Sequence, residues 1–148
     1  MSTRCNIEFY TQYDEKNKPQ KGVILYHHYD GYPRFMGNRL PKMLDRTFEL
    51  LKGAGYPYWW DDERVTATLI KLDGQDYEEK EEGRGGIPVF QPCSSLHGDI
   101  EYLWRVYLGP KDGKYKIKCY DVTMDWDKNE IKSLKEIKNW KALAKKGH

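Results

Sequence analysis

Polar and apolar residues alternate strictly at the start of the chain, from Arg4 to Tyr10. A strand with one buried face gives this pattern, because successive side chains point to opposite sides. A second strand is predicted over 22–28, where β-branched and aromatic residues are concentrated. The intervening stretch, 14–21, is polar and typical of a loop. We therefore expect an antiparallel hairpin with a long connection.

The clearest helical spacing lies in the next segment. We expect a loop over 29–38 and a helix that begins near Pro41, since proline suits the first helical turn. Gly53 and Gly55 predict the end of this helix. Its apolar face is formed by Leu40, Met43, Leu44, Phe48 and Leu51.

The segment 61–72 is compatible with two kinds of secondary structure. Its β-branched residues favour a strand, whereas its acidic start and the glycine at its end favour a helix. We predict a helix, because Val65, Leu69 and Leu72 share one helical face.

Further strands and one helix are predicted in the second half. A short strand is expected over 87–90, then a strand over 100–108 and a return strand over 114–121, joined by an Asp-Gly turn at 110–113. The stretch 122–132 could add a further ribbon. Ser133 to Glu136 fits a capping box, which predicts that the last helix opens there.

These elements predict a single α+β domain over residues 1–148. The expected architecture is an antiparallel sheet of about four to six strands, with two or three helices packed mainly on one face. The charged, glycine-rich stretch near 77–86 is expected to be a mobile loop.

Composition limits the possible environments and partners of the protein. The net charge of +2 is too small to indicate nucleic acid as the primary partner. No apolar run approaches the length of a membrane span, and the N-terminus lacks a signal-peptide pattern. Three widely spaced cysteines argue against a disulfide framework and predict free thiols in a reducing, cytoplasmic setting.

Two segments combine imidazoles with carboxylates, the groups used to bind metals or to transfer protons. One holds His27, His28 and Asp30; the other holds His97, Asp99 and Glu101. Only one of the adjacent histidines can face the core, and the sequence does not fix which. The carboxylates could equally hold turns through backbone N–H groups. We expect the turn 29–33 and the segment 97–101 to lie together in a cleft.

Three other patterns could carry chemistry. Arg4 and Asn6 are expected beside Tyr26 or His28 across the first strand pair, where arginine could bind an anion. Cys93 stands four residues from His97, a spacing compatible with a thiolate–imidazole pair. Lysines at 135, 138, 141 and 145 would form one face of the last helix, which is most often simply solvated.

Three motifs of the chain resemble a small family of uncharacterised proteins associated with phages and prophages. These are Ser-Thr-Arg-x-x-Ile from Ser2, Tyr-x-His-x-Asp-Gly-Tyr-Pro from Tyr26, and Gly-Asp-Ile-Glu-Tyr from Gly98. The resemblance implies a mobile-element context and no particular activity, cofactor or reaction.

The leading hypothesis is a binding protein for a small anionic or nucleotide-like ligand, or for a host protein. One alternative is a metal-assisted phosphodiesterase, with His28, Asp30, His97 and Asp99 as ligands and Glu101 as general base. Another is a protein-interaction module built on the aromatic cluster 56–60. The oligomeric state and any cofactor stay open. The candidate ligand-binding residues are Arg4, Asn6, Tyr26, His28, Asp30, Tyr32, His97, Asp99 and Glu101.

Overall fold

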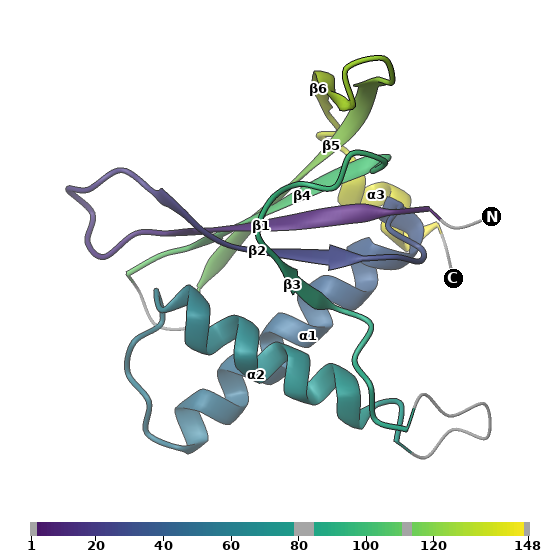
Figure 1. Ribbon diagram of the computed structural model, residues 1–148. Coiled ribbons are helices and arrows are strands. Elements are labelled where there is room, and N and C mark those ends of the chain that lie inside the picture. Colours follow the sequence, from purple (N-terminus) through teal and green to yellow (C-terminus); the bar gives the residue numbers. More distant parts are fainter. Residues whose placement is uncertain (1–2, 79–84, 111–113, 147–148) are drawn as a thin grey trace.

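A six-stranded sheet organises the fold, in the order β3-β2-β1-β4-β5-β6 (Figure 1). The computed structural model describes residues 3–78, 85–110 and 114–146. The fold is α+β, as the sequence predicts. The strands are β1 (Cys5–Thr11), β2 (Gln20–His27), β3 (Gln91–Cys93), β4 (Tyr102–Leu108), β5 (Tyr115–Asp125) and β6 (Glu130–Glu136).

The sheet is mixed, which corrects the expectation of a purely antiparallel one. β1 and β4 run parallel, with Ile7 opposite Trp104 and Phe9 opposite Val106. All other neighbouring strands are antiparallel, including the predicted pairs β1–β2 and β4–β5. The alternation of a strand indicates which side chains are buried but not the direction of its neighbour. The parallel seam therefore could not be derived from the pattern.

Three helices pack on one face of this sheet: α1 (Pro33–Gly53), α2 (Asp62–Gln75) and α3 (Trp140–Lys145) (Figure 1). Their apolar side chains join those of β1 and β4 in one core, which includes the fully buried Phe9, Leu44 and Trp104. Phe48, at the centre of the predicted helical seam, is 6% exposed. The core therefore lies between the helices and a single side of the sheet.

Helix α1 begins at Pro33, eight residues before the predicted start. Pro33 occupies the first turn, where its missing N–H costs no hydrogen bond. Pro41 lies inside the helix instead of opening it. The helix does end at Gly53, and Gly55 follows with a φ of 75°. The presence of a proline did not distinguish a helix start at Pro33 from one at Pro41, because apolar residues at helical spacing follow both positions.

The ambiguous segment before residue 76 is helix α2. The Asp61 carboxylate caps it, accepting a hydrogen bond from Arg64 N at 3.0 Å. The short strand predicted over 87–90 is absent there, and β3 begins at Gln91. The backbone amides of Val89 and Phe90 instead donate to the buried Asp73 carboxylate, at 2.7 and 2.9 Å. The Asp73 carboxylate therefore links residues 89–90 to α2, just before the chain enters strand β3.

The predicted capping box near residue 133 is wrong, because the segment is strand β6. Leu134 pairs with Val122 of β5, and α3 begins only at Trp140. The lysines at 135, 138, 141 and 145 consequently do not form one helical face, since Lys135 is in the strand. Pairing with β5 overrides the local helix signal, and the predicted ribbon after 122 becomes the β5–β6 hairpin.

Two expectations fall partly outside the described residues: the mobile loop at 77–86 and the Asp-Gly turn at 110–113. Within the described ranges, no helix is both long enough and apolar enough to cross a membrane. The cysteines Cys5, Cys93 and Cys119 are free.

Candidate functional site

The face of the sheet opposite the helices has two different parts. The first lies under the segment 94–101, which connects β3 to β4 and crosses this face (Figure 1). Tyr26, Leu103 and Ile100 form a small second core beneath it. The other part, toward the C-terminal ends of β1 and β4, carries tyrosines and basic side chains. The predicted candidate residues cluster around the covered part.

Asn6 is fully buried and holds the covering segment in place. Its Oδ1 accepts a hydrogen bond from the His97 amide at 2.8 Å. Its Nδ2 donates to the Leu25 carbonyl at 2.9 Å and to Cys93 Sγ at 3.4 Å. We expected Asn6 to face outward. It does lie on the outer face, but the segment 94–101 buries it. Its polar atoms serve internal contacts and therefore indicate a structural role.

Tyr26, His28 and His97 meet on this face through their rings. Tyr26 stacks on His97 with ring centroids 3.7 Å apart, and its hydroxyl lies 2.8 Å from His28 Nδ1. Burial raises the pKa of Tyr26, and the nearby Asp99 carboxylate raises it further. His27 is the core histidine, 3% exposed, and burial lowers its pKa. The imidazoles thus pack against protein groups.

Arg4 and Asp99 form an ion pair at the edge of the same cluster. Arg4 Nε lies 3.2 Å from Asp99 Oδ2, and the two side chains are 34% and 46% exposed, respectively. The Glu101 amide donates to the Arg4 carbonyl at 2.9 Å, whereas its side chain is exposed. The predicted anion-binding arginine is therefore already paired with a carboxylate.

The segments 29–33 and 97–101 both contact the start of β1. The Gly31 amide donates to the Thr3 carbonyl at 2.8 Å, next to the Arg4 carbonyl that accepts from Glu101. Asp30 has a φ of 51° and accepts a hydrogen bond from the Tyr32 hydroxyl at 3.2 Å. These contacts place Asp30 and Tyr32 in their own turn. They account for the turn without a ligand.

Chemistry by a metal or a thiolate has little support in this cluster. Among the residues that the structure describes, no three His, Cys, Asp or Glu side chains are grouped to hold a metal ion. Cys93 Sγ contacts Asn6 Nδ2 and lies 3.6 Å from the Ile24 carbonyl. Burial raises the pKa of Cys93, which disfavours the thiolate that a nucleophile requires.

The aromatic cluster 56–60 is partly structural. Trp59 packs against the core beside Phe48, with centroids 5.9 Å apart, and the Tyr56 hydroxyl donates to Asp61 at 2.6 Å. Tyr58 is 49% exposed. Two of the four aromatic side chains in this cluster therefore contribute directly to the fold. The interaction-module hypothesis stays a prediction.

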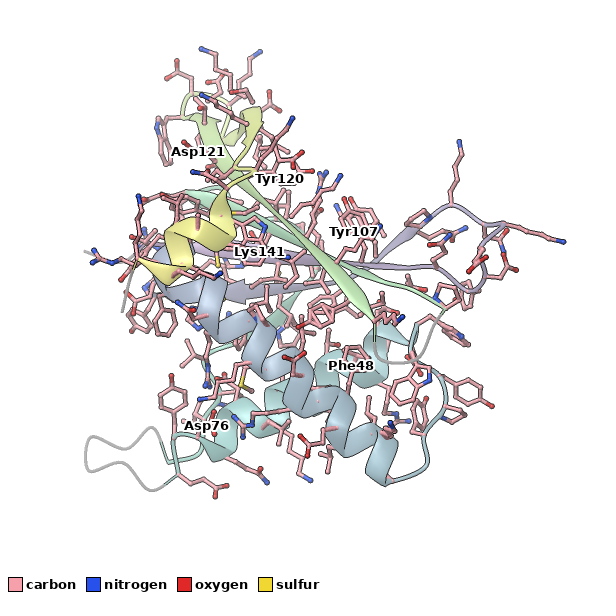
Figure 2. All side chains as sticks on the ribbon, turned by 180° about the vertical axis from the view of Figure 1, so that it is seen from behind. Phe48, Asp76, Tyr107, Tyr120, Asp121 and Lys141 are labelled. Carbon is pink, nitrogen blue, oxygen red and sulfur yellow. The ribbon has the colours of Figure 1, made fainter. Side chains whose placement is uncertain are left out.

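The uncovered part of the outer sheet face carries a second and unpredicted group, which we call the tyrosine–arginine face. Arg105 lies between two rings, with its guanidinium carbon 5.7 Å from the Tyr10 centroid and 4.8 Å from the Tyr120 centroid. Tyr10 and Tyr107 stack at 5.0 Å with an interplanar angle of 20°. Figure 2 shows Tyr107 and the core residue Phe48 on opposite sides of β5. The members of the tyrosine–arginine face are Tyr10, Arg105, Tyr107 and Lys118, together with Tyr120, which packs against the second core at the border of the covered part.

The buried Glu8 fixes Arg105 on this face. Glu8 is 1% exposed, and its carboxylate contacts Arg105 Nε at 2.9 Å and Lys21 Nζ at 2.6 Å. Burial alone would lower the pKa of Arg105, but the Glu8 carboxylate outweighs it and raises the pKa. Two cations thus compensate one carboxylate, and the guanidinium is held over both tyrosine rings.

A hollow of about 840 Å³ opens at the end of this face. It lies between the β1–β2 connection and the ends of β4 and β5, with Gln12 and Pro19 on one side. Tyr107 contributes an aromatic wall, and Lys114, Lys116 and Lys118 also line the hollow. Lys118 Nζ is 5.7 Å from the Tyr107 centroid. The volume of the hollow lies within the range of small-molecule sites.

The sequence contained a signal for this face. Arg105 and Tyr107 alternate with buried residues on β4, and Lys116, Lys118 and Tyr120 alternate with buried or half-buried residues on β5. The alternation predicts one shared outer face for each strand. Only the pairing of Arg105 with Lys118 and of Tyr107 with Lys116 brings the two sets together.

The fold and this surface define an α+β protein whose mixed sheet has helices on one side and an aromatic, basic patch on the other. No protein-family model matches the chain, and no curated protein or solved structure matches it significantly. The patch is therefore the feature of the molecule that indicates a function.

Proposed function

We propose that the protein binds a nucleotide-like anion on the tyrosine–arginine face, with its base or ring on Tyr107 and its phosphates on the β5 lysines. The observation that carries the proposal is the hollow described above, because Tyr107 and three lysines line the same space. A planar ring stacks on an aromatic side chain, and ammonium groups bind phosphate as point charges.

The electrostatics of the face support an anionic ligand. Lys114, Lys116 and Lys118 are exposed. The nearest carboxylate of the sheet, Glu8, is buried and bound by Arg105 and Lys21, so its charge is compensated. Asp121 follows Tyr120 in the sequence but has the opposite strand parity and points to the other face. Glu15 also lines the hollow, but three lysines outnumber this one carboxylate. An incoming phosphate therefore meets a local excess of positive charge despite a net charge of only +2.

The geometry supports binding more than catalysis. The polar and aromatic groups around the hollow are rings, three lysine amines, an amide and the Glu15 carboxylate, and Arg105 is already held by Glu8. General acid–base chemistry requires a group that titrates near neutral pH within reach of the ligand. The described lining includes no histidine or cysteine. The phage context stays a prediction from the family resemblance, and a host protein as the alternative partner stays a prediction as well.

Titration of the full chain with ATP, AMP and inorganic pyrophosphate tests the proposal. We expect saturable binding of ATP that is tighter than that of AMP or pyrophosphate, because ATP offers both a base and several phosphates. Tyr107→Ala should weaken ATP binding by roughly 5- to 100-fold, the range for losing one stacked base. Tyr58→Ala, an exposed tyrosine elsewhere, is the matched control and should bind like the wild type. Equal affinity of both variants would contradict the proposal.

A further inference from the structure

Building on the proposed nucleotide site, we propose that the tyrosine–arginine face binds single-stranded nucleic acid, whose bases stack on more than one tyrosine while its phosphates follow the lysines of β5. The ligand class thereby becomes an oligonucleotide instead of a mononucleotide.

Two stacking stations lie on the face, and they are too far apart for one base. The first is the stacked pair Tyr10–Tyr107, and the second is the half-buried Tyr120, which borders the small second core. Tyr107 is opposite Lys116, and Tyr120 lies four residues further along β5. At about 3.3 Å per residue this separation is roughly 13 Å along the strand. Several consecutive nucleotides are needed to occupy both stations.

Arg105 connects the two stations. Its guanidinium contacts the Tyr10 ring on one side and the Tyr120 ring on the other. Its charge is balanced by Glu8, so Arg105 holds the two rings in place while other cations bind the phosphates. The face therefore offers a continuous path of planar groups.

The lysines are spaced for an extended strand. Lys116 and Lys118 occupy alternate positions of β5 with side chains on the outer face, and the exposed Lys114 lies just before the strand. Alternate residues of a strand are roughly 6.6 Å apart, which is close to the distance between neighbouring phosphates of an extended single strand. The row of lysines lies directly beside Arg105 and Tyr107 of β4. Positive charges thus run parallel to the stacking path.

A single strand fits these features better than a duplex. The rings of a sheet face can only contact bases whose flat surfaces are free, and a duplex encloses those surfaces in its own stack. The outer face is also wide and uncovered here, whereas duplex recognition places a protruding helix or ribbon in a groove. The small net charge is no obstacle, because the basic side chains are concentrated beside the rings.

Fluorescence anisotropy with labelled 12-nucleotide RNA and DNA single strands and the matching duplexes tests this inference on the full chain. Both single strands should bind more tightly than ATP and more tightly than the duplexes. Tyr120→Ala should weaken 12-mer binding about 10-fold and leave ATP binding unchanged, because ATP reaches only Tyr107. Tyr120→Phe keeps the ring and should bind like the wild type, which separates stacking from a folding defect.

Salt dependence gives a second readout. With three lysines on phosphates, the logarithm of the affinity for the 12-mer should fall with the logarithm of salt concentration with a slope of about −2. Lys116→Gln should make this slope shallower, whereas Lys128→Gln, in the β5–β6 connection, should not change it. A 12-mer that binds no more tightly than ATP would overturn the inference while leaving the nucleotide site intact. Duplex binding equal to single-strand binding would also overturn it, and failure of both ATP and 12-mer would refute both proposals.

Discussion

The Glu8 carboxylate lies 2.9 Å from Arg105 Nε across the parallel seam between β1 and β4. Glu8 is almost fully buried, and it also binds Lys21 of β2. One carboxylate therefore connects three neighbouring strands and holds the guanidinium at the centre of the tyrosine–arginine face.

Glu8→Gln should lower the free energy of unfolding by about 1.5–3 kcal/mol, because it removes the charge from hydrogen bonds to two cations. Urea unfolding measures this loss. Glu49→Gln, at an exposed position of α1, is the control and should change stability by less than about 0.5 kcal/mol. A loss for Glu8→Gln as small as that of the control would show that the buried carboxylate contributes little.

Phe48→Ala should cost about 3–5 kcal/mol, since Phe48 is 6% exposed and stacks on Tyr115 at 5.9 Å. Leu50 lies on the same helix but is 43% exposed, and Leu50→Ala should cost far less. Thermal or urea denaturation of the two variants compares them directly. Similar losses would mean that the apolar seam of α1 is wrongly assigned.

Gly37→Ala should destabilise the protein even though alanine favours a helix by about 1 kcal/mol over glycine. A Cβ at Gly37 would lie 2.8 Å from Ala144 Cβ, so α3 would have to move away from α1. Gly53→Ala is the matched test, because a Cβ there meets nothing within 4 Å. Melting temperatures should fall for the first variant and hold or rise for the second.

Asp76 should contribute to stability at neutral pH and lose that contribution in acid. Its hydrogen bonds to Arg46, and then to Arg39, hold the pKa of the carboxyl below its usual value despite partial burial. A pKa depressed in the folded state stabilises above the unfolded pKa of about 3.9, and this stabilisation disappears as the pH falls through the folded value. Asp76→Asn should therefore lower the urea midpoint at pH 7 and have a much smaller effect at pH 2–3. An equal effect at both pH values would exclude this linkage.

Asp30→Asn and Asp99→Asn should leave ATP binding unchanged, because both carboxylates hold local contacts away from the hollow. Asparagine tolerates the positive φ of Asp30. Asp99→Asn removes only a partly exposed ion pair with Arg4, a loss within about 1 kcal/mol. If either variant abolished ATP binding at unchanged melting temperature, the site would lie in the segments first predicted.

Local patterns predicted the elements of the first half well. The alternation from Arg4 and the helical seam around Phe48 depend on burial of one face, which the sequence records residue by residue. The predictions failed where a distant partner decided the outcome. Leu134 joined β6 because β5 was available to pair with it, and Val89 and Phe90 donate to Asp73 instead of forming a strand.

The same reason explains the outcome for the candidate site. Asn6, Tyr26 and His97 were predicted as ligand-binding residues, and the structure brings them together, but the sequence could not reveal that the segment 94–101 covers this part of the sheet. A buried polar network and a ligand site use the same residue types. Conversely, Arg105 and Tyr107 resembled ordinary outward-facing residues until their pairing with the lysines of β5 was known.

The parallel seam also affects how the protein emerges from the ribosome. Glu8 and Arg105 are 97 residues apart, so β1 is complete long before its second neighbour exists. At about 5–20 residues per second, that interval lasts roughly 5–20 s. Throughout it, one edge of β1 exposes backbone N–H and C=O groups that another nascent chain could pair with. The open edge of β1 is therefore covered only when β4 has been made, and until then the newly made chain is exposed to aggregation through this edge.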